Sequence, residues 1–216
     1  MIREACVQTV AQALTAVSLG AERLELCARL ELEGTTPSLP YVREVLEKVK
    51  VPIHVMVSPM PMRPVPTFIF TDQDIQHMIY EIRQLKQIGV QGFVIGALNR
   101  DMSINYVAVN ALMKEAPDHV FTFHKAIDRT PDPLVSFIQL QQETKVDFVL
   151  TSGGQSSAAE GLKVLEQMIA VEASAKVIVA GKVTHENLAT LHQNLKASNY
   201  HGRSIVGNLQ SNALSL

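Results

Sequence analysis

Eight short runs rich in β-branched residues alternate with longer stretches of helical periodicity, and this alternation constrains the fold more than any other feature. The predicted strands cover residues 2–7, 23–27, 51–57, 92–97, 120–126, 146–151, 176–181 and 198–202. Strands that alternate with helices pair in parallel through right-handed crossovers. An open doubly wound sheet and a closed (β/α)8 barrel both satisfy this pattern, and the count of eight strands favours the barrel.

The helical stretches have clear apolar stripes and clear ends. From Ile75, apolar residues recur up to Ile88; Thr71 is a predicted N-cap and Gly89 a stop signal. Further helices are predicted around residues 10–17, 104–115, 133–142, 162–169 and 188–195. The tail after Val206 is too short for a normal eighth helix. We therefore predict one domain over residues 1–216, a small (β/α)8 TIM barrel with an incomplete eighth helix.

Charge and composition exclude several classes of protein. A formal charge of −2 without a basic cluster argues against a nucleic-acid partner. No apolar run approaches the roughly 20 residues that cross a bilayer, so we expect no membrane span. Arg3 and Glu4 stand where a signal peptide would have its apolar core. Two cysteines indicate a reducing compartment rather than a disulfide framework, so the expected location is the cytoplasm.

Two connections that leave strands are long, and they mark one face of the predicted barrel. They follow residues 27 and 57, and Pro59, Pro61, Pro64 and Pro66 stiffen the second. Barrel enzymes carry their sites on the face where the strands end. We therefore expect these loops to wall a pocket there.

The face on which each strand residue lies follows from alternation. In RLELC, Leu24 and Leu26 belong outside against helices, which leaves Glu25 and Cys27 inside. The same reasoning points Glu4 and Cys6 of the first strand inward. The backbones of the two cysteines would then lie about 4.8 Å apart on neighbouring strands.

Three histidines accompany these groups. Alternation points His54, Met56 and Ser58 inward from the third strand and places His124 on the same face as Thr122. An ionised carboxylate in an apolar interior costs several kcal/mol unless a cation, a proton or a metal relieves it. His54, His124 and His201 are available for that purpose. A single cysteine or histidine is more often ordinary core, but the combination indicates a functional site.

The chain resembles the copper homeostasis protein CutC family over nearly its whole length. The resemblance is carried by EAC (4–6), GAERLELCA (20–28), GTTPS (34–38), VPIHVMV (51–57), FTFHKAID (121–128), VLTSGG (149–154) and HG (201–202). It implies a TIM barrel, a role in cytosolic copper handling, binding of Cu(I), and a dimer or other homo-oligomer. The family's strand-end acids, cysteines and histidines fall on Glu4, Glu25, Cys6, Cys27, His54, His124 and His201, and Asp128 matches the acid that closes HKAID.

Several positions depart from the family pattern. Ser58 stands where the family usually has an arginine, and Lys125 where arginine is common. Glu33 and Thr35 replace residues of the glycine-rich segment before the PS pair, and AGKVTHEN is one glycine shorter than usual. These departures bring anion binding at the family positions into question.

Two functions remain open at this point. The first is copper homeostasis with Cu(I) bound by Cys6 and Cys27, since soft thiolates suit Cu(I). The second is a barrel enzyme for a small polar or anionic metabolite, with Glu4 and Glu25 as acid and base. In the second, the supporting acid–base groups are His54, His124, Asp128 and His201, and the backbone N–H groups of Ser152, Gly153 and Gly154 bind a phosphate. A purely structural role is the third and weakest possibility.

Overall fold

The eight strands pair in parallel with their neighbours in sequence, and β1 also pairs with β8, so the sheet closes into a barrel. The computed structural model describes residues 1–59 and 67–209. Within them the strands are β1 (Ile2–Val7), β2 (Arg23–Leu26), β3 (Ile53–Met56), β4 (Gly92–Ile95), β5 (Val120–Phe123), β6 (Phe148–Thr151), β7 (Lys176–Val179) and β8 (Asn199–Gly202). The closed sheet confirms the predicted (β/α)8 barrel and excludes the open doubly wound sheet.

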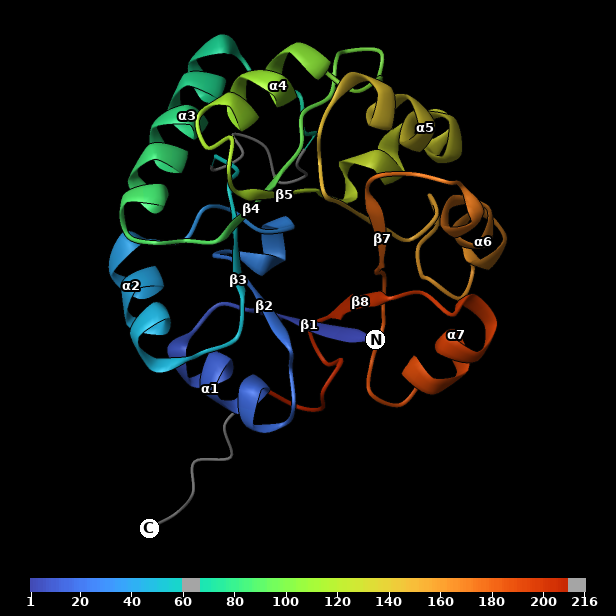
Figure 1. The fold of residues 1–216 in the computed structure, drawn as a ribbon, viewed down its shortest axis with the longest axis horizontal. Coiled ribbons are helices and arrows are strands. Elements are labelled where there is room, and N and C mark those ends of the chain that lie inside the picture. Colours follow the sequence, from blue (N-terminus) through green and yellow to red (C-terminus); the bar gives the residue numbers. More distant parts are fainter. Residues whose placement is uncertain (60–66, 210–216) are drawn as a thin grey trace.

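Helices surround the barrel as an outer ring (Figure 1). Among the described residues these α-helices are α1 (Val10–Ser18), α2 (Leu39–Lys48), α3 (Asp72–Gln87), α4 (Tyr106–Lys114), α5 (Pro133–Glu143), α6 (Leu162–Ala170) and α7 (Leu188–Leu195). Helix α3 begins with the capping box of Thr71 and Asp74, which satisfies two backbone N–H groups. Helix α5 begins at Pro133, where the missing N–H costs little, and Asp132 caps it.

The two faces of each strand belong to different clusters of buried side chains. Leu24 and Leu26 belong to the main core that the helices share, together with Ala5 and Val7 of β1. By contrast, a separate inner cluster is formed by Cys6, Cys27, Met56 and Val94. This division confirms the predicted alternation of the first three strands. Leu24 is fully buried, so truncating it to alanine would cost about 2–5 kcal/mol.

Every strand except β1 is shorter than its predicted range, and β2 and β5 differ in ways that bear on the site. Strand β2 ends at Leu26, so Cys27 follows it directly. Strand β5 ends at Phe123, because the Nδ1 atom of His124 accepts the N–H of Ala126 and turns the chain into a 3-10 helix over Lys125–Arg129. This local hydrogen bond competes with strand pairing, which the sequence pattern of TFHKA does not reveal.

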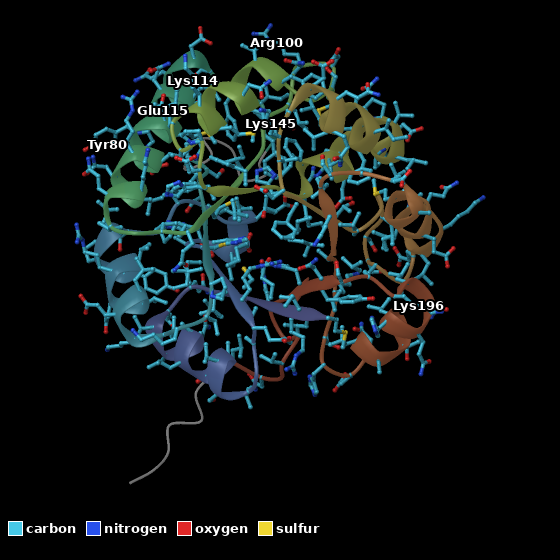
Figure 2. All side chains as sticks on the ribbon, in the orientation of Figure 1. Tyr80, Arg100, Lys114, Glu115, Lys145 and Lys196 are labelled. Carbon is cyan, nitrogen blue, oxygen red and sulfur yellow. The ribbon has the colours of Figure 1, made fainter. Side chains whose placement is uncertain are left out.

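Residues 203–209 after β8 form no α-helix, in agreement with the predicted incomplete eighth unit. Residues 210–216, and Pro61, Pro64 and Pro66 of the predicted loop, lie outside the described residues. Across 1–59 and 67–209, none of the helices has the length and apolar character needed to span a bilayer. Figure 2 shows Tyr80 and Lys114 on the outer ring of helices, away from the barrel centre.

Candidate functional site

The inward side chains of β1, β2 and β8 meet inside the barrel. Register pairs Glu4 with Arg23 on one side and with His201 on the other. It pairs Glu25 with Cys6 and with His54. Glu4 is 1% exposed and Glu25 is 4% exposed, so both predicted carboxylates lie in the interior rather than in bulk water. The structure thus brings together the acids, the thiols and His201 as the alternation predicts.

Glu4 is the centre of a buried charge network. Its carboxylate forms an ion pair with Arg23 and accepts a hydrogen bond of 2.7 Å from Nδ1 of His201. His54 lies further away, with Nδ1 3.9 Å from the same carboxylate. Burial raises the pKa of Glu4, but His201 and Arg23 outweigh burial and hold that pKa well below its usual range. Glu4 is therefore a carboxylate at neutral pH.

Arg23 is a site residue that the sequence reasoning missed. Its guanidinium also donates to Oδ1 of Asn199 at 3.3 Å and lies 4.7 Å from the centre of the Phe148 ring. It is two positions before Glu25 and so shares its inward face. The signal was present in the alternation, which applies to Arg23 as much as to Glu25.

The two thiols lie beside Glu25. Sγ of Cys6 is 3.7 Å from Sγ of Cys27, and one ligand atom from each of Cys6, Glu25 and Cys27 lies within 4.8 Å of the others. The predicted backbone adjacency of the cysteines is wrong, because the register places Cys6 opposite Glu25. Cys27 is two positions further along, and its side chain brings the sulfur atoms together. The thioether of Met56 packs in the same inner cluster.

The protonation states in this cluster differ strongly. The hydrogen bond from Cys27 lowers the pKa of Cys6 well below its ordinary value, although burial opposes this. The same bond and burial raise the pKa of Cys27. Burial and the charge of Cys6 raise the pKa of Glu25. The cluster therefore favours the thiolate on Cys6, while Cys27 and Glu25 beside it hold their protons more tightly than usual.

His201 connects the two acids. Its Nε2 atom lies 3.6 Å from Oε2 of Glu25, while Nδ1 donates to Glu4. Burial lowers the pKa of His201, but Glu25, Cys6 and Glu4 together raise it well above its ordinary value. The imidazolium form is thus favoured, with Nδ1–H donated to Glu4 and Nε2 facing Glu25.

The rings of His54 and His124 each fill the space beside a glycine that lies in β4 or directly after it. A Cβ atom on Gly92 would lie 2.4 Å from the His54 ring, and one on Gly96 would lie 2.4 Å from the His124 ring. Burial lowers the pKa of His54 and of His124 to about 4, so both rings are neutral at pH 7. Neither Nδ1 of His54 nor Nε2 of His124 has a hydrogen-bond partner within the described part of the chain.

Asp128 does not face the acids but holds the loop after β6. Its carboxylate accepts hydrogen bonds from the hydroxyl groups of Thr151 and Ser152 and from the backbone N–H groups of Ser152 and Gly154. The N–H of Gly153 is donated to Oγ1 of Thr151 at 2.9 Å. The free N–H groups on which the predicted phosphate site at residues 152–154 depends are therefore occupied by the protein itself.

A cavity of about 520 Å³ opens above the thiols at the carboxyl ends of the strands. Cys6, Glu25, Cys27 and His201 line it, and Met56, Phe68, Leu150 and His124 form apolar and aromatic wall. His54 and Glu4 are not among the lining residues, so they lie behind the accessible groups. Phe68, in the long loop after β3, lines the cavity as that loop was predicted to do.

The family of this chain follows from three comparisons. The model of the CutC family matches residues 1–206. A CutC family protein of Pasteurella multocida is 34% identical over 92% of this chain and 80% of its own length. A protein named copper homeostasis protein cutC homolog from Homo sapiens is 34% identical over 93% of this chain and 72% of its own.

The fold comparison agrees with the sequence comparisons. A CutC crystal structure from Streptococcus agalactiae superposes with a TM-score of 0.87 over 95% of this chain and 99% of that one, at 24% identity. At that level of identity, the superposition shows only that the two chains share the barrel fold. Together with the family model and the two relatives, it leads to one conclusion: the chain belongs to the CutC family.

Proposed function

We propose that this protein serves copper homeostasis by binding Cu(I) through Cys6 and Cys27. The observation that carries the proposal is the 3.7 Å separation of the two sulfur atoms on the wall of an open cavity. Thiolates are the preferred ligands of Cu(I), and a thioether is also suitable. Cys6 supplies the thiolate, and Met56 in the same inner cluster supplies the thioether.

The residues present fit Cu(I) better than harder ions. Glu25 has a raised pKa and is the only carboxyl group in the group of three ligand atoms among the described residues, so the set offers mainly sulfur. Calcium and magnesium prefer several oxygen ligands, which this set does not provide. The imidazolium of His201 does not ligate while protonated, but its charge favours the nearby thiolate.

A titration with Cu(I) under anaerobic, reducing conditions against a chromophoric competitor tests this proposal. The wild type is expected to bind one Cu(I), and Cys6→Ser with Cys27→Ser is expected to lose that binding while keeping its circular dichroism spectrum. Met56→Leu is expected to weaken binding, whereas Met78→Leu, a matched change at a buried methionine in α3, leaves it unchanged. Equal stoichiometry and affinity in the double serine variant would show that the thiols are not the site.

A second candidate function is catalysis on a small polar or anionic metabolite. It is supported by the arrangement in which His201 contacts both Glu4 and Glu25, one acid with a lowered pKa and one with a raised pKa. A protonated Glu25 at the cavity wall is able to give a proton to a bound molecule, and His201 stabilises the carboxylate that results. A metabolite screen by thermal shift identifies candidate substrates, which are expected to stabilise the wild type. A turnover assay with the same compound is then expected to show activity for the wild type and none for Glu25→Gln.

We also propose that the protein acts in the cytoplasm as a homo-oligomer, most simply a dimer. Two unpaired cysteines in a functional position support a reducing location. Exposed apolar side chains on α4 and α5, with Val107 at 83% exposure, support contact with a second copy. Light scattering of the purified protein tests the oligomer, and a monomer at micromolar concentration would contradict it.

A further inference from the structure

The cavity is far larger than the binding of a metal ion requires. Its volume of about 520 Å³ compares with roughly 30 Å³ for one water molecule. Cavities of 300–1,000 Å³ with apolar walls and a few convergent polar groups are typical of small-molecule sites. The thiols occupy one part of this cavity, so most of its wall has no role in the proposed binding of Cu(I).

His124 lines this cavity and carries a buried hydrogen-bond donor that the described part of the protein does not use. Its Nδ1 atom accepts the backbone N–H of Ala126 at 3.1 Å, so in the neutral ring the proton is on Nε2. The residue is 3% exposed, and its Nε2 has no partner among the residues that the structure describes. A buried donor without an acceptor costs about 1–3 kcal/mol, which a ligand oxygen would recover.

The His124 ring is held firmly in that orientation. The Phe68 ring lies 4.7 Å from it, between centroids, and Gly96 leaves the space that the ring fills. Phe68 itself has a backbone φ of +59°, a conformation that a bulky residue adopts only when its surroundings enforce it. The Nε2–H group is therefore preorganised rather than free to turn away.

The mouth of the cavity carries an excess of positive charge. Lys125, Lys182 and Arg203 line it, and they come from the ends of β5, β7 and β8. Lys182 is exposed and makes no ion pair within residues 1–59 and 67–209. Lys125 lies 3.7 Å from Asp128, and Arg203 donates to the carbonyl of Leu30.

The acids near this mouth do not cancel all of its cations, because among the described residues Asp128 pairs with Lys125 alone. Glu33 also lines the cavity, but its carboxylate is paired with Arg129 at 3.0 Å. The mouth therefore combines unpaired positive charge with hydroxyl groups, because Ser204 and Thr184 are further lining residues. Such a combination attracts and orients oxyanions.

We propose that this cavity binds a small organic anion, whose carboxylate or phosphate oxygen accepts the hydrogen bond of His124 and whose charge is paired with Lys182. The apolar part of the anion lies against Phe68 and Leu150. This deepens the second candidate function, since it names the ligand class for the same cavity, but it does not depend on copper or on Glu25. It also moves the anion site from residues 152–154 to the ends of β5 and β7.

Three small probes test the proposal on the full-length, chelator-treated protein under reducing conditions. Benzoate and phenyl phosphate carry the two kinds of anionic group, and benzamide is a neutral molecule of nearly the same shape as benzoate. Calorimetry and saturation-transfer NMR measure their binding. At least one anion is expected to bind about tenfold more tightly than benzamide. Which anion binds more tightly distinguishes a carboxylate site from a phosphate site.

Variants assign the binding to the named groups. Lys182→Gln is expected to weaken the anion about fivefold, whereas Lys50→Gln, an exposed lysine following α2, leaves binding unchanged. His124→Phe keeps the ring packing, removes the donor and is expected to weaken the anion about tenfold. Because Lys182 is exposed, its variant remains informative if His124→Phe fails to fold.

The outcomes separate this proposal from the others. Cys6→Ser with Cys27→Ser is expected to keep the anion and lose Cu(I), so that the two sites fail independently. Turnover by Glu25 is assayed separately and does not enter the binding measurement. Binding of benzamide as tight as that of the anions, absence of binding by every anionic probe, or unchanged affinity in Lys182→Gln would overturn the proposal.

Discussion

His201 on β8 donates a hydrogen bond of 2.7 Å from Nδ1 to Glu4 on β1, and so joins residues that are 197 positions apart in the chain. The same carboxylate pairs with Arg23, so one buried acid contacts two buried basic groups. Buried ion pairs contribute little net stability when intact, but removal of one partner leaves an uncompensated charge. This asymmetry gives the first prediction.

Glu4→Gln is expected to lower the free energy of unfolding by about 3–5 kcal/mol, because Arg23 loses its counter-ion in the barrel interior. The matched control is Glu22→Gln, since Glu22 pairs with Arg3 between the same two segments but with 43% and 36% of the side chains exposed. The control is expected to cost less than about 1 kcal/mol. Urea denaturation measures both, and equal losses would contradict the buried network.

Acid is expected to destabilise the fold through its neutral histidines. The pKa of His54 and that of His124 are about 4 in the folded chain, below the ordinary value of 6.5. The unfolded chain therefore binds more protons, and stability falls as the pH drops from about 6.5 to about 4. The loss is about 3 kcal/mol per histidine at the acid end and levels off below it.

The variant His124→Gln is expected to show a shallower loss of stability between pH 6.5 and 4 than the wild type, measured by urea denaturation at several pH values. His185→Gln serves as the control, because His185 is exposed and solvated in both states. Parallel curves for the wild type and His124→Gln would contradict a neutral, buried His124.

Gly96→Ala is expected to destabilise the protein by about 1–3 kcal/mol, because its Cβ would lie 2.4 Å from Cε1 of His124. A double-mutant cycle gives the sharpest measurement. In the His124→Ala background the obstructing ring is absent, so Gly96→Ala is expected to cost much less there. The same cost in both backgrounds would mean that Gly96 serves a different purpose.

Asp128→Asn is expected to cost about 3 kcal/mol, because the carboxylate accepts hydrogen bonds from Ser152 and Gly154 that an amide cannot fully replace. Asp101→Asn is the control, since Asp101 accepts similar bonds from Ser103 in an exposed turn. Thermal denaturation compares the two variants. A small loss in stability combined with a large loss in ligand binding would instead return Asp128 to the acid–base role predicted from the sequence.

Much of the fold followed from periodicity, because each strand must bury two different faces. Strand β2 is an example. Its Leu24 and Leu26 belong to the core shared with the helices, whereas Cys27 belongs to the inner cluster. The register of strand pairing was harder to predict from the sequence. Alternation assigns a face but not a partner, so the pairing of Cys6 with Glu25 could not be read from the chain.

The details of the site depended on contacts over long distances in sequence. Asp128 occupies the N–H groups of a loop that begins 23 positions later, and no local pattern indicates that contact. The positive φ of Phe68 likewise has no signature in its residue type. Arg23 is different, because it stands two positions before Glu25 and alternation places both on the inward face. Arginine is usually exposed to solvent, which argues the other way.

The closure of the barrel between β1 and β8 also has a consequence for synthesis. Both cysteines precede β3 in the chain, whereas the strand that carries His201 is the last of the eight to be translated. During elongation the sulfur atoms have no imidazolium beside them and no enclosing wall. Protection of the thiols from oxidants and from unwanted metals therefore begins only when β8 has been synthesised and closes the barrel.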